Sequence, residues 1–110
     1  MSVQDITATS LHNWLEDKDK AIKPVVLDVR EHFEHNLAHI NIAKLVPMKE
    51  IPFEIKYMDK NLTYVCFCHH GIKSKKVAVF LRDNGFNEVF NLVGGIESWS
   101  NLIDNDVAKY

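Results

Sequence analysis

Two short segments constrain the fold of this chain more than any other feature. Val25 to Val29 is apolar on both sides of an extended backbone, apart from Asp28. Leu62 to Cys68 is rich in residues that favour strands. A strand that is apolar on both sides is typical of a sheet covered on both faces. We therefore expect a sheet whose strands are buried between layers of helices.

Helical patterns alternate with these strands. Leu11, Trp14 and Leu15 form an apolar stripe with Thr9 or Ser10 as its cap. A longer helix is expected from Ile72 to Asn84, with Gly85 as its left-handed terminator and Phe86 as the apolar residue beyond it. The remaining elements are short: helices over 31–37 and 96–102, strands over 40–46 and 89–90, and an irregular connection punctuated by Pro47 and Pro52. This alternation predicts the α/β class, with a mainly parallel sheet and helices on both faces.

Composition narrows the class of protein. The chain has 110 residues, 46% of them apolar, and a net charge of −2, which suits one packed domain and argues against a general nucleic-acid binder. The N-terminal segment lacks the apolar stretch of a secretory signal, and no apolar run reaches membrane-spanning length. The two cysteines, Cys66 and Cys68, are too close in sequence to crosslink distant elements. We therefore expect a cytoplasmic protein with no membrane association and no structural disulfides.

The loop from Cys68 to Ser74 contains the strongest candidates for reactive and anion-binding groups. It joins a buried strand to a helix, and ligands of parallel sheets bind beyond the carboxyl ends of the strands. Amide hydrogens in the first turn of a helix favour negative charge, so Cys68 should be a thiolate at neutral pH. Gly71 lets the backbone curl tightly, and Lys73 adds a positive charge near the cysteine. Lys75 and Lys76 are either further anion-attracting groups or ordinary solvated lysines.

Four segments in register resemble the single-domain rhodaneses, a family of thiosulfate sulfurtransferases and persulfide carriers. The segments are Asp28-Val29-Arg30 with Glu34; His39-Ile40 with Ala43; the Cys68-to-Ser74 loop; and Gly94-Gly95-Ile96 with Trp99. The resemblance extends from about 6 to 102 in one rhodanese-like domain over 1–110, and we expect the tail 104–110 to be frayed. It implies a rhodanese-like fold with roughly five strands and Cys68 as the catalytic nucleophile.

The resemblance also implies a reaction and a binding loop. Cys68 would take sulfane sulfur from a small donor such as thiosulfate and pass it, as a persulfide, to cyanide, a thiol or a protein acceptor. The substrate-binding residues would be His69, His70, Gly71, Ile72, Lys73 and Ser74, with no cofactor. From Cys68 through Lys73 the loop has six positions, as in sulfurtransferases of this family; the related phosphatases and arsenate reductases have one residue more. Lys73 and His69 stand where many relatives have arginine, which puts the strength of thiosulfate binding in question.

Several residues allow a second interpretation. Asp28, Arg30 and Glu34 are interpreted as structural support for the loop, although Asp28 and Arg30 could also be catalytic. Cys66 is interpreted as a small buried hydrophobe, with a resolving cysteine as the alternative. Six histidines raise the question of a metal, but the chain has no established zinc spacing and we predict no metal site. A non-catalytic rhodanese-like interaction domain is the competing function.

Overall fold

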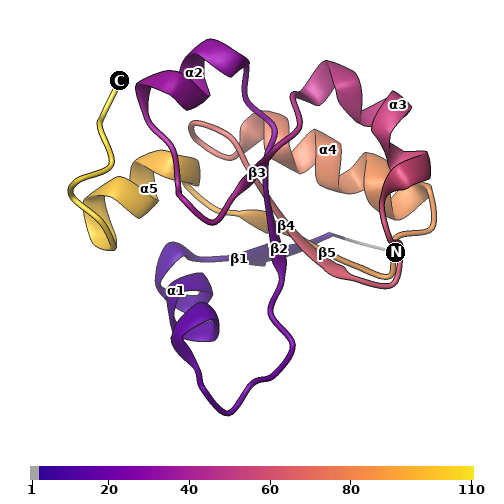
Figure 1. Cartoon of the computed structure of the whole chain (residues 1–110), viewed down its shortest axis with the longest axis horizontal. Helices are drawn as coiled ribbons and strands as arrows, with labels where there is room; N and C mark the ends of the chain where they lie inside the picture. Colours follow the sequence, from indigo (N-terminus) through magenta and orange to yellow (C-terminus); the bar gives the residue numbers. More distant parts are fainter. Residues whose placement is uncertain (1–2) are drawn as a thin grey trace.

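A five-stranded parallel sheet forms the centre of the protein. The computed structural model describes residues 3–110, and Figure 1 shows the arrangement of its elements. The strand order is β1-β5-β4-β2-β3, and every pairing is parallel. The strands are β1 (Gln4–Ile6), β2 (Val25–Asp28), β3 (Lys44–Leu45), β4 (Thr63–Phe67) and β5 (Glu88–Leu92). The predicted α/β class and the expected parallel sheet of about five strands are therefore confirmed.

Helices connect the strands and cover both faces of the sheet. The α-helices are α1 (Ala8–Glu16), α2 (His32–Leu37), α3 (Ile51–Glu54), α4 (Ile72–Asp83) and α5 (Gly95–Leu102). Two single-turn 3₁₀ helices, η1 (Met48–Glu50) and η2 (Ile55–Tyr57), flank α3 in the connection that Pro47 and Pro52 punctuate. In Figure 1, α3 and α4 lie above the strands and α1 lies below them. No helix within residues 3–110 is both long and hydrophobic enough to cross a bilayer.

The core consists of two hydrophobic clusters, one on each face of the sheet. On one face, Cys66 and Cys68 lie in a cluster that includes Val77 and Leu81 of α4. On the other face, Val65 and the ring of Phe67 pack in a cluster with apolar side chains of α1 and α5. The alternation of side chains along β4 thus places both cysteines on the α4 side. This double coverage explains why β2 and β4 are apolar on both sides.

The ends of the helices follow local sequence signals. The hydroxyl of Thr7 caps α1 by accepting from the Ser10 amide (3.1 Å), so the expected cap at Thr9 or Ser10 was two or three residues late. The amides of Gly85 and Phe86 donate to the carbonyls of Arg82 and Leu81, which is the Schellman arrangement expected at the end of α4. Gly85 adopts a φ of 88°, as a left-handed terminator requires.

Two strands differ from their predicted form. The strand expected over 40–46 reduces to two residues, because Ile40 belongs to a turn in which its carbonyl accepts from Ala43 (2.9 Å). Strand β1 was not predicted at all. Its three residues are polar or only half-buried, so no hydrophobic pattern marks them, and only pairing with β5 makes them a strand.

Candidate active site

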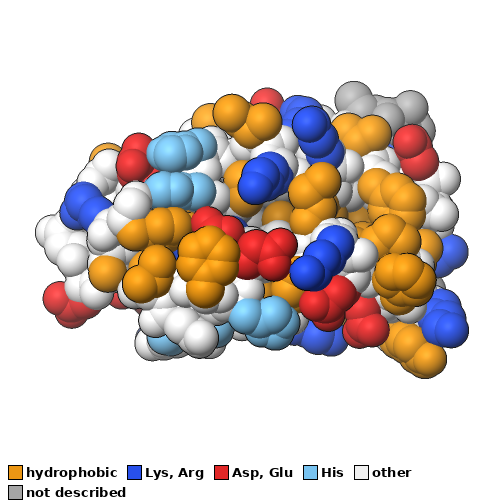
Figure 2. Space-filling model, turned by 90° about the horizontal axis from the view of Figure 1, so that it is seen from above, with side chains coloured by type: hydrophobic (Ala, Val, Ile, Leu, Met, Phe, Trp, Pro, Cys, Tyr) orange, Lys and Arg blue, Asp and Glu red, His pale blue; other side chains and the backbone are white. Residues whose placement is uncertain are grey.

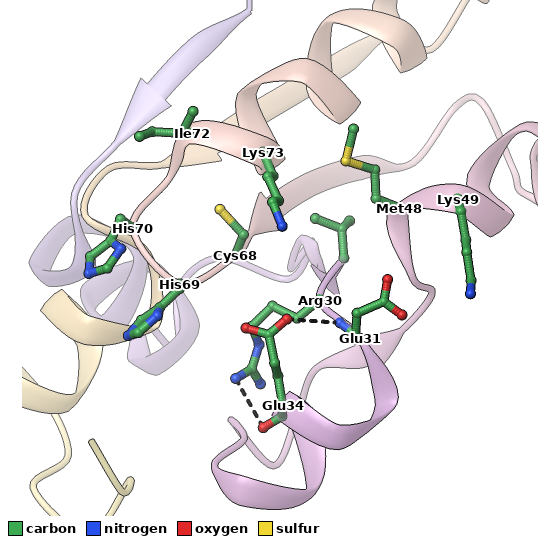
Figure 3. A pocket seen from close by; sticks show the side chains of 11 residues that line it. Arg30, Glu31, Glu34, Met48, Lys49, Cys68, His69, His70, Ile72 and Lys73 are labelled. Carbon is green, nitrogen blue, oxygen red and sulfur yellow. Dashed lines mark hydrogen bonds between the residues drawn. The ribbon is translucent and has the colours of Figure 1, made fainter. Parts of the chain in front are cut away.

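Cys68 lies where the connections of the sheet change direction. From β2 the chain moves outward to β3, and from β4 it moves the opposite way to β5. Parallel sheets have a crevice at such a switch point, beyond the carboxyl ends of the two adjacent strands. A pocket of about 600 Å³ occupies this place, with Val29, Arg30 and Glu31 on the β2 side and Cys68 and His69 on the β4 side (Figure 3).

Backbone amides surround the sulfur of Cys68. The amide of Gly71 donates to Sγ at 3.2 Å, and the amide of Ser74 donates to it at 3.4 Å. The hydroxyl of Ser74 lies 3.3 Å from the same atom. The Cys68 residue is only 5% exposed, so these groups replace most of the water around the sulfur. Two amide donors aimed at one atom favour negative charge on it.

The helix after β5, α5, binds the backbone of this loop. The amide of Ile96 donates to the Cys68 carbonyl (2.9 Å), and the amide of Glu97 donates to the His69 carbonyl (3.3 Å). Gly95 makes this approach possible, because a Cβ at this position would lie 2.4 Å from both carbonyl oxygens. The first turn of α5 therefore positions the loop through backbone contacts alone.

The predicted binding residues divide into two groups. His69, His70, Ile72 and Lys73 line the pocket together with Cys68, and Figure 3 shows the Lys73 ammonium pointing into it. Gly71 and Ser74 are buried and do not line the pocket. Their contacts are with the sulfur and the surrounding backbone, so any role in the reaction is exerted on Cys68.

The neighbouring lysines lie outside this pocket. Lys75 pairs with Asp5 on β1, with 3.0 Å between the charged groups. Lys75 and Lys76 line a second, shallower hollow on the other side of the loop. Of the three lysines in the first turn of α4, Lys73 is the one that faces Cys68 (Figure 3).

Asp28 and Arg30 form a buried pair with no free donor. Arg30 donates to both carboxylate oxygens of Asp28 at 2.9 and 2.7 Å. Its other guanidinium contacts are to the carbonyls of Glu34 and Ala38 and to the Tyr110 hydroxyl. All five N–H groups therefore have acceptors. This is the geometry that structural support requires, and it leaves no guanidinium hydrogen for a substrate.

Glu34 belongs to the same hydrogen-bond network. Its carboxylate accepts from the Glu31 amide in a capping box at the start of α2 and from the Tyr110 hydroxyl at 2.9 Å. Together with the Arg30 contact to its carbonyl, this ties α2 to the segment after β2 (Figure 3).

Cys66 differs from Cys68 in its surroundings. It is fully buried, and burial, with a smaller contribution from Cys68, raises its pKa to about 12. At neutral pH it is therefore a thiol with no access to solvent. These properties fit the interpretation of Cys66 as a small buried hydrophobe and not as a resolving cysteine.

The C-terminal tail contradicts the expectation that it is frayed. Val107 is buried, and its carbonyl accepts from the Ser100 hydroxyl at 2.6 Å. Tyr110 stacks on His69 with 4.0 Å between ring centroids and accepts a hydrogen bond from Arg30. Burial is the main cause that raises the pKa of Tyr110 to about 12. The mostly polar composition of the tail gives no sign of these contacts.

Other residues of the site were also missed. Met48 and Lys49 of η1 line the pocket, although nothing in their segment marked them as functional. Asn91 is buried beneath the loop and bonds to Gly71 and Ser74. A polar residue within a strand that is otherwise mostly apolar was the signal that could have identified it.

A group of titratable side chains gathers at the rim of the pocket. The imidazole of His70 lies 3.4 Å from the carboxylate of Glu97, and that of His69 lies 4.0 Å from it. The two imidazoles stack on each other. These side chains are partly or largely exposed, and ordinary histidine–carboxylate attraction accounts for their contacts, so we assign no metal to them.

The fold and the site together define a class of protein: parallel α/β proteins with a cysteine on a strand-to-helix loop at the switch point of the sheet. Comparison with known families makes the assignment specific. Residues 7–102 match the Rhodanese-like domain family, so the chain belongs to this family. The resemblance stated from sequence is confirmed.

Individual relatives agree with this assignment. Thiosulfate sulfurtransferase GlpE of Coxiella burnetii is 36% identical over 75 residues, covering 68% of this chain and 70% of that protein. The probable adenylyltransferase/sulfurtransferase MoeZ of Mycobacterium tuberculosis is 29% identical over 107 residues, which are 96% of this chain but 26% of that protein. A crystal structure of a rhodanese-like domain protein from Staphylococcus aureus has a TM-score of 0.79 and 34% identity, covering 88% of this chain and 91% of that one.

Proposed function

We propose that the protein is a sulfurtransferase that carries sulfane sulfur as a persulfide on Cys68. The observation that carries this proposal is the setting of the Cys68 sulfur. It lies at the edge of the pocket, and the Gly71 and Ser74 amides donate to it. A cysteine in this setting is a nucleophile whose negative charge is stabilised by fixed backbone donors. Relatives named as sulfurtransferases support the same chemistry.

The proposed reaction has two steps. In the first, the Cys68 thiolate attacks the outer sulfur of thiosulfate; the new S–S bond forms as the old one breaks, and sulfite leaves with the bonding pair. In the second, a thiophilic acceptor such as cyanide, a thiol or a protein attacks the terminal sulfur, and Cys68 leaves as a thiolate. Covalent catalysis of this kind divides one difficult transfer into two easier ones. Neither step needs a cofactor.

The pocket supplies the remaining groups. The Lys73 ammonium offers a positive charge to an anionic donor, and His69, His70 and Ile72 form the rest of the wall on the loop side (Figure 3). Gly71 and Ser74 act on the sulfur from within the fold. On the face shown in Figure 2, lysine, acidic, histidine and hydrophobic side chains are interspersed, which fits a small anionic donor better than a polyanion such as nucleic acid.

The competing function is an interaction domain without catalysis. Such a domain needs neither a cysteine at the switch point nor amides directed at it, so the ordered contacts around Cys68 favour the enzyme. Phosphatase or arsenate reductase activity is less well supported, because the loop from Cys68 to Lys73 has the shorter length that resembles sulfurtransferases.

Intact mass spectrometry tests the proposal. After incubation with thiosulfate, the parent protein should gain the mass of one sulfur atom, and cyanide should remove it. Cys68→Ser should gain nothing, because an alcohol does not form a persulfide. Cys66→Ser is the matched control, and it should still gain the sulfur.

Two results would contradict the proposal. One is a parent protein that stays at its original mass with thiosulfate and with organic persulfides as donors, which would favour the interaction domain. The other is loss of the sulfur adduct in both cysteine variants when both are folded, which would indicate a dithiol mechanism.

A further inference from the structure

Asn91 is a buried polar side chain that the proposed reaction does not use. It lies on β5, opposite Cys66 in the register of β4, and is 5% exposed. Its Nδ2 donates to the Gly71 carbonyl at 3.0 Å, and its Oδ1 lies 2.6 Å from the Ser74 hydroxyl. Both partners belong to the segment that surrounds the sulfur of Cys68.

The direction of each hydrogen bond in this group follows from the chemistry of the atoms. A backbone carbonyl only accepts, so the group that faces Gly71 must be the amide NH₂ of Asn91. The carbonyl oxygen Oδ1 therefore faces Ser74, and because it only accepts, the Ser74 hydroxyl must donate to it. A hydroxyl has one hydrogen. Ser74 thus turns only lone pairs toward Cys68 Sγ, 3.3 Å away.

This arrangement distinguishes between the protonation states of Cys68. A thiol can donate its S–H to Ser74 and complete a chain from Cys68 through Ser74 and Asn91 to the Gly71 carbonyl. A thiolate has no hydrogen to donate and faces the lone pairs of Ser74. If the hydroxyl rotates toward the thiolate, Asn91 Oδ1 becomes a buried acceptor without a donor, which is unfavourable. In the persulfide the charge lies on the outer sulfur, so the hydroxyl can stay on Asn91.

We propose that Asn91 is a positioning residue that keeps the Ser74 hydroxyl from donating to Cys68. The Gly71 and Ser74 amides favour the thiolate, and the Asn91–Ser74 pair limits how far they do so. The thiolate remains the form of Cys68 that attacks the donor. This inference rests on the proposed role of Cys68, but it concerns the thiol before any sulfur is transferred.

Other groups near Cys68 also influence its protonation, and the test must hold them constant. The charged and titratable side chains that line the pocket are Arg30, Glu31, Glu34, Lys49, His69, His70 and Lys73. Cys66 lies in the same core cluster, and Glu97 of α5 contacts the two histidines. Substitutions at Asn91 and Ser74 change none of these, so differences between such variants report on the hydrogen-bond network.

The test is the rate of Cys68 alkylation by iodoacetamide as a function of pH, with the modified residue identified by peptide mass. Asn91→Leu, which keeps the branching at Cγ but has no polar atoms, frees the Ser74 hydroxyl to donate to the thiolate. The midpoint of the profile should move to lower pH by about one unit, since a hydrogen bond to a charged group is stronger than one to a neutral group. In a Ser74→Ala background, the same substitution should not move it.

A purely structural role for Asn91 predicts a different change in the alkylation profile. If Asn91 only supports the loop, Asn91→Leu should have the same effect with and without the Ser74 hydroxyl, and that result would overturn the proposal. A shift to higher pH, or no shift, in folded Asn91→Leu would also overturn it. Ser100→Ala removes a buried hydroxyl that bonds to Val107 on the other face, and it is the matched control that should leave the profile unchanged.

If Asn91→Leu does not fold, the alkylation profile of Ser74→Ala tests the proposal instead. Under the proposal, Ser74 accepts from the thiol, so removal of its oxygen should move the profile to lower pH or leave it in place. A shift to higher pH would mean that Ser74 donates to the thiolate, which contradicts the proposal. Alkylation reports on the thiol whether or not the protein transfers sulfur, so the persulfide mass assay can fail independently of this experiment.

Discussion

Two cysteines of one sequence segment have opposite chemical character in this protein. Both project toward α4, but Cys66 lies within β4 and Cys68 lies one residue beyond its end, at the pocket. Burial raises the pKa of the Cys66 thiol to about 12, whereas Cys68 has the Gly71 amide as a donor. At the scale of single residues, position relative to the end of the strand decides which thiol can react.

Cys66 should make the protein less stable at alkaline pH. As pH rises above 9, the unfolded chain loses the Cys66 proton while the folded chain keeps it, until the pKa of about 12 is reached. The stabilising contribution is thus fully present below pH 9 and is lost as pH rises toward 12, by about 4 kcal/mol at most. Cys66→Ala should be about 1 kcal/mol less stable at pH 7 because of the small cavity.

Urea denaturation from pH 7 to pH 11 measures this difference. The free energy of unfolding should fall more steeply with pH in the parent than in Cys66→Ala, so that the two curves converge and then cross at about pH 10. Parallel curves would show that the Cys66 thiol does not titrate differently in the folded and unfolded states.

Lys73 should contribute to the capture of thiosulfate. Lys73→Ala removes the ammonium that points into the pocket, and kcat/KM for thiosulfate should fall about three- to tenfold at low salt and less at high salt, because salt screens exposed charges. Lys73→Arg should retain the rate or increase it. Lys75→Ala is the control, since the Lys75 ammonium pairs with Asp5 away from Cys68. Equal rates for the parent and Lys73→Ala at both salt concentrations would show that the loop amides suffice.

At the scale of elements, the loop that contains Cys68 depends on a helix that carries no reacting group. The first amides of α5 bind the carbonyls of Cys68 and His69, while the amides of α4 and the preceding loop face the sulfur. The loop is thus held from both sides by helix starts, where free N–H groups are available. This explains why two segments 28 residues apart in sequence form one site.

Gly95→Ala should disrupt this contact. The added Cβ would lie 2.4 Å from the carbonyl oxygens of Cys68 and His69, so α5 or the loop has to move. We expect a loss of at least about 3 kcal/mol of stability, or failure to fold. Gly85→Ala is a matched control, because Gly85 also has a positive φ but its Cβ would meet only the Lys60 side chain at 3.9 Å. It should cost about 1 kcal/mol.

Thermal and urea unfolding compare the two glycine variants directly. Equal destabilisation would mean that the positive φ alone is responsible and that close packing under the loop is not. The sulfur-transfer rate of any folded Gly95→Ala protein should also fall, whereas Gly85→Ala should keep the parent rate.

At the scale of the whole molecule, the C-terminal tail joins parts of the site that are distant in sequence. Tyr110 contacts Arg30 after β2, Glu34 of α2 and His69 of the loop that contains Cys68. Its contact with Arg30 joins residues 80 positions apart. The two walls of the pocket are therefore tied together by the tail as well as by the sheet.

Deletion of residues 107–110 should lower the stability of the protein and loosen the link between the two walls of the pocket. Loss of the buried Val107 side chain and of the Tyr110 hydrogen bonds should cost about 2 to 3 kcal/mol. Tyr110→Phe should cost about 1 kcal/mol, and Lys109→Ala, an exposed control, should cost little. Urea denaturation measures all three. A deletion with the stability of the parent would restore the original expectation of a frayed tail.

Some features of this protein follow from the sequence by itself, because they depend on neighbours along the chain. The buried strands β2 and β4, the termination of α4 at Gly85 and the place of Cys68 between a strand and a helix are all encoded by local patterns of apolar residues and glycine. The rhodanese resemblance rests on residues that recur in order, so it too was visible without coordinates. These features were sufficient to predict the fold class, and they support the proposal of Cys68 as the nucleophile.

Contacts between segments that are distant in sequence complete the site, and these contacts are seen only in the folded protein. β1 becomes a strand by pairing with β5, Gly95 matters because α5 packs under the loop, and Asn91 and Tyr110 acquire their roles from partners 17 to 80 residues away. A parallel sheet brings together segments that are remote in sequence, and a single polar side chain carries no mark of the partner that it will meet. The hydrogen bonds around Cys68 were therefore determined by packing, although each residue that makes them was present in the sequence from the start.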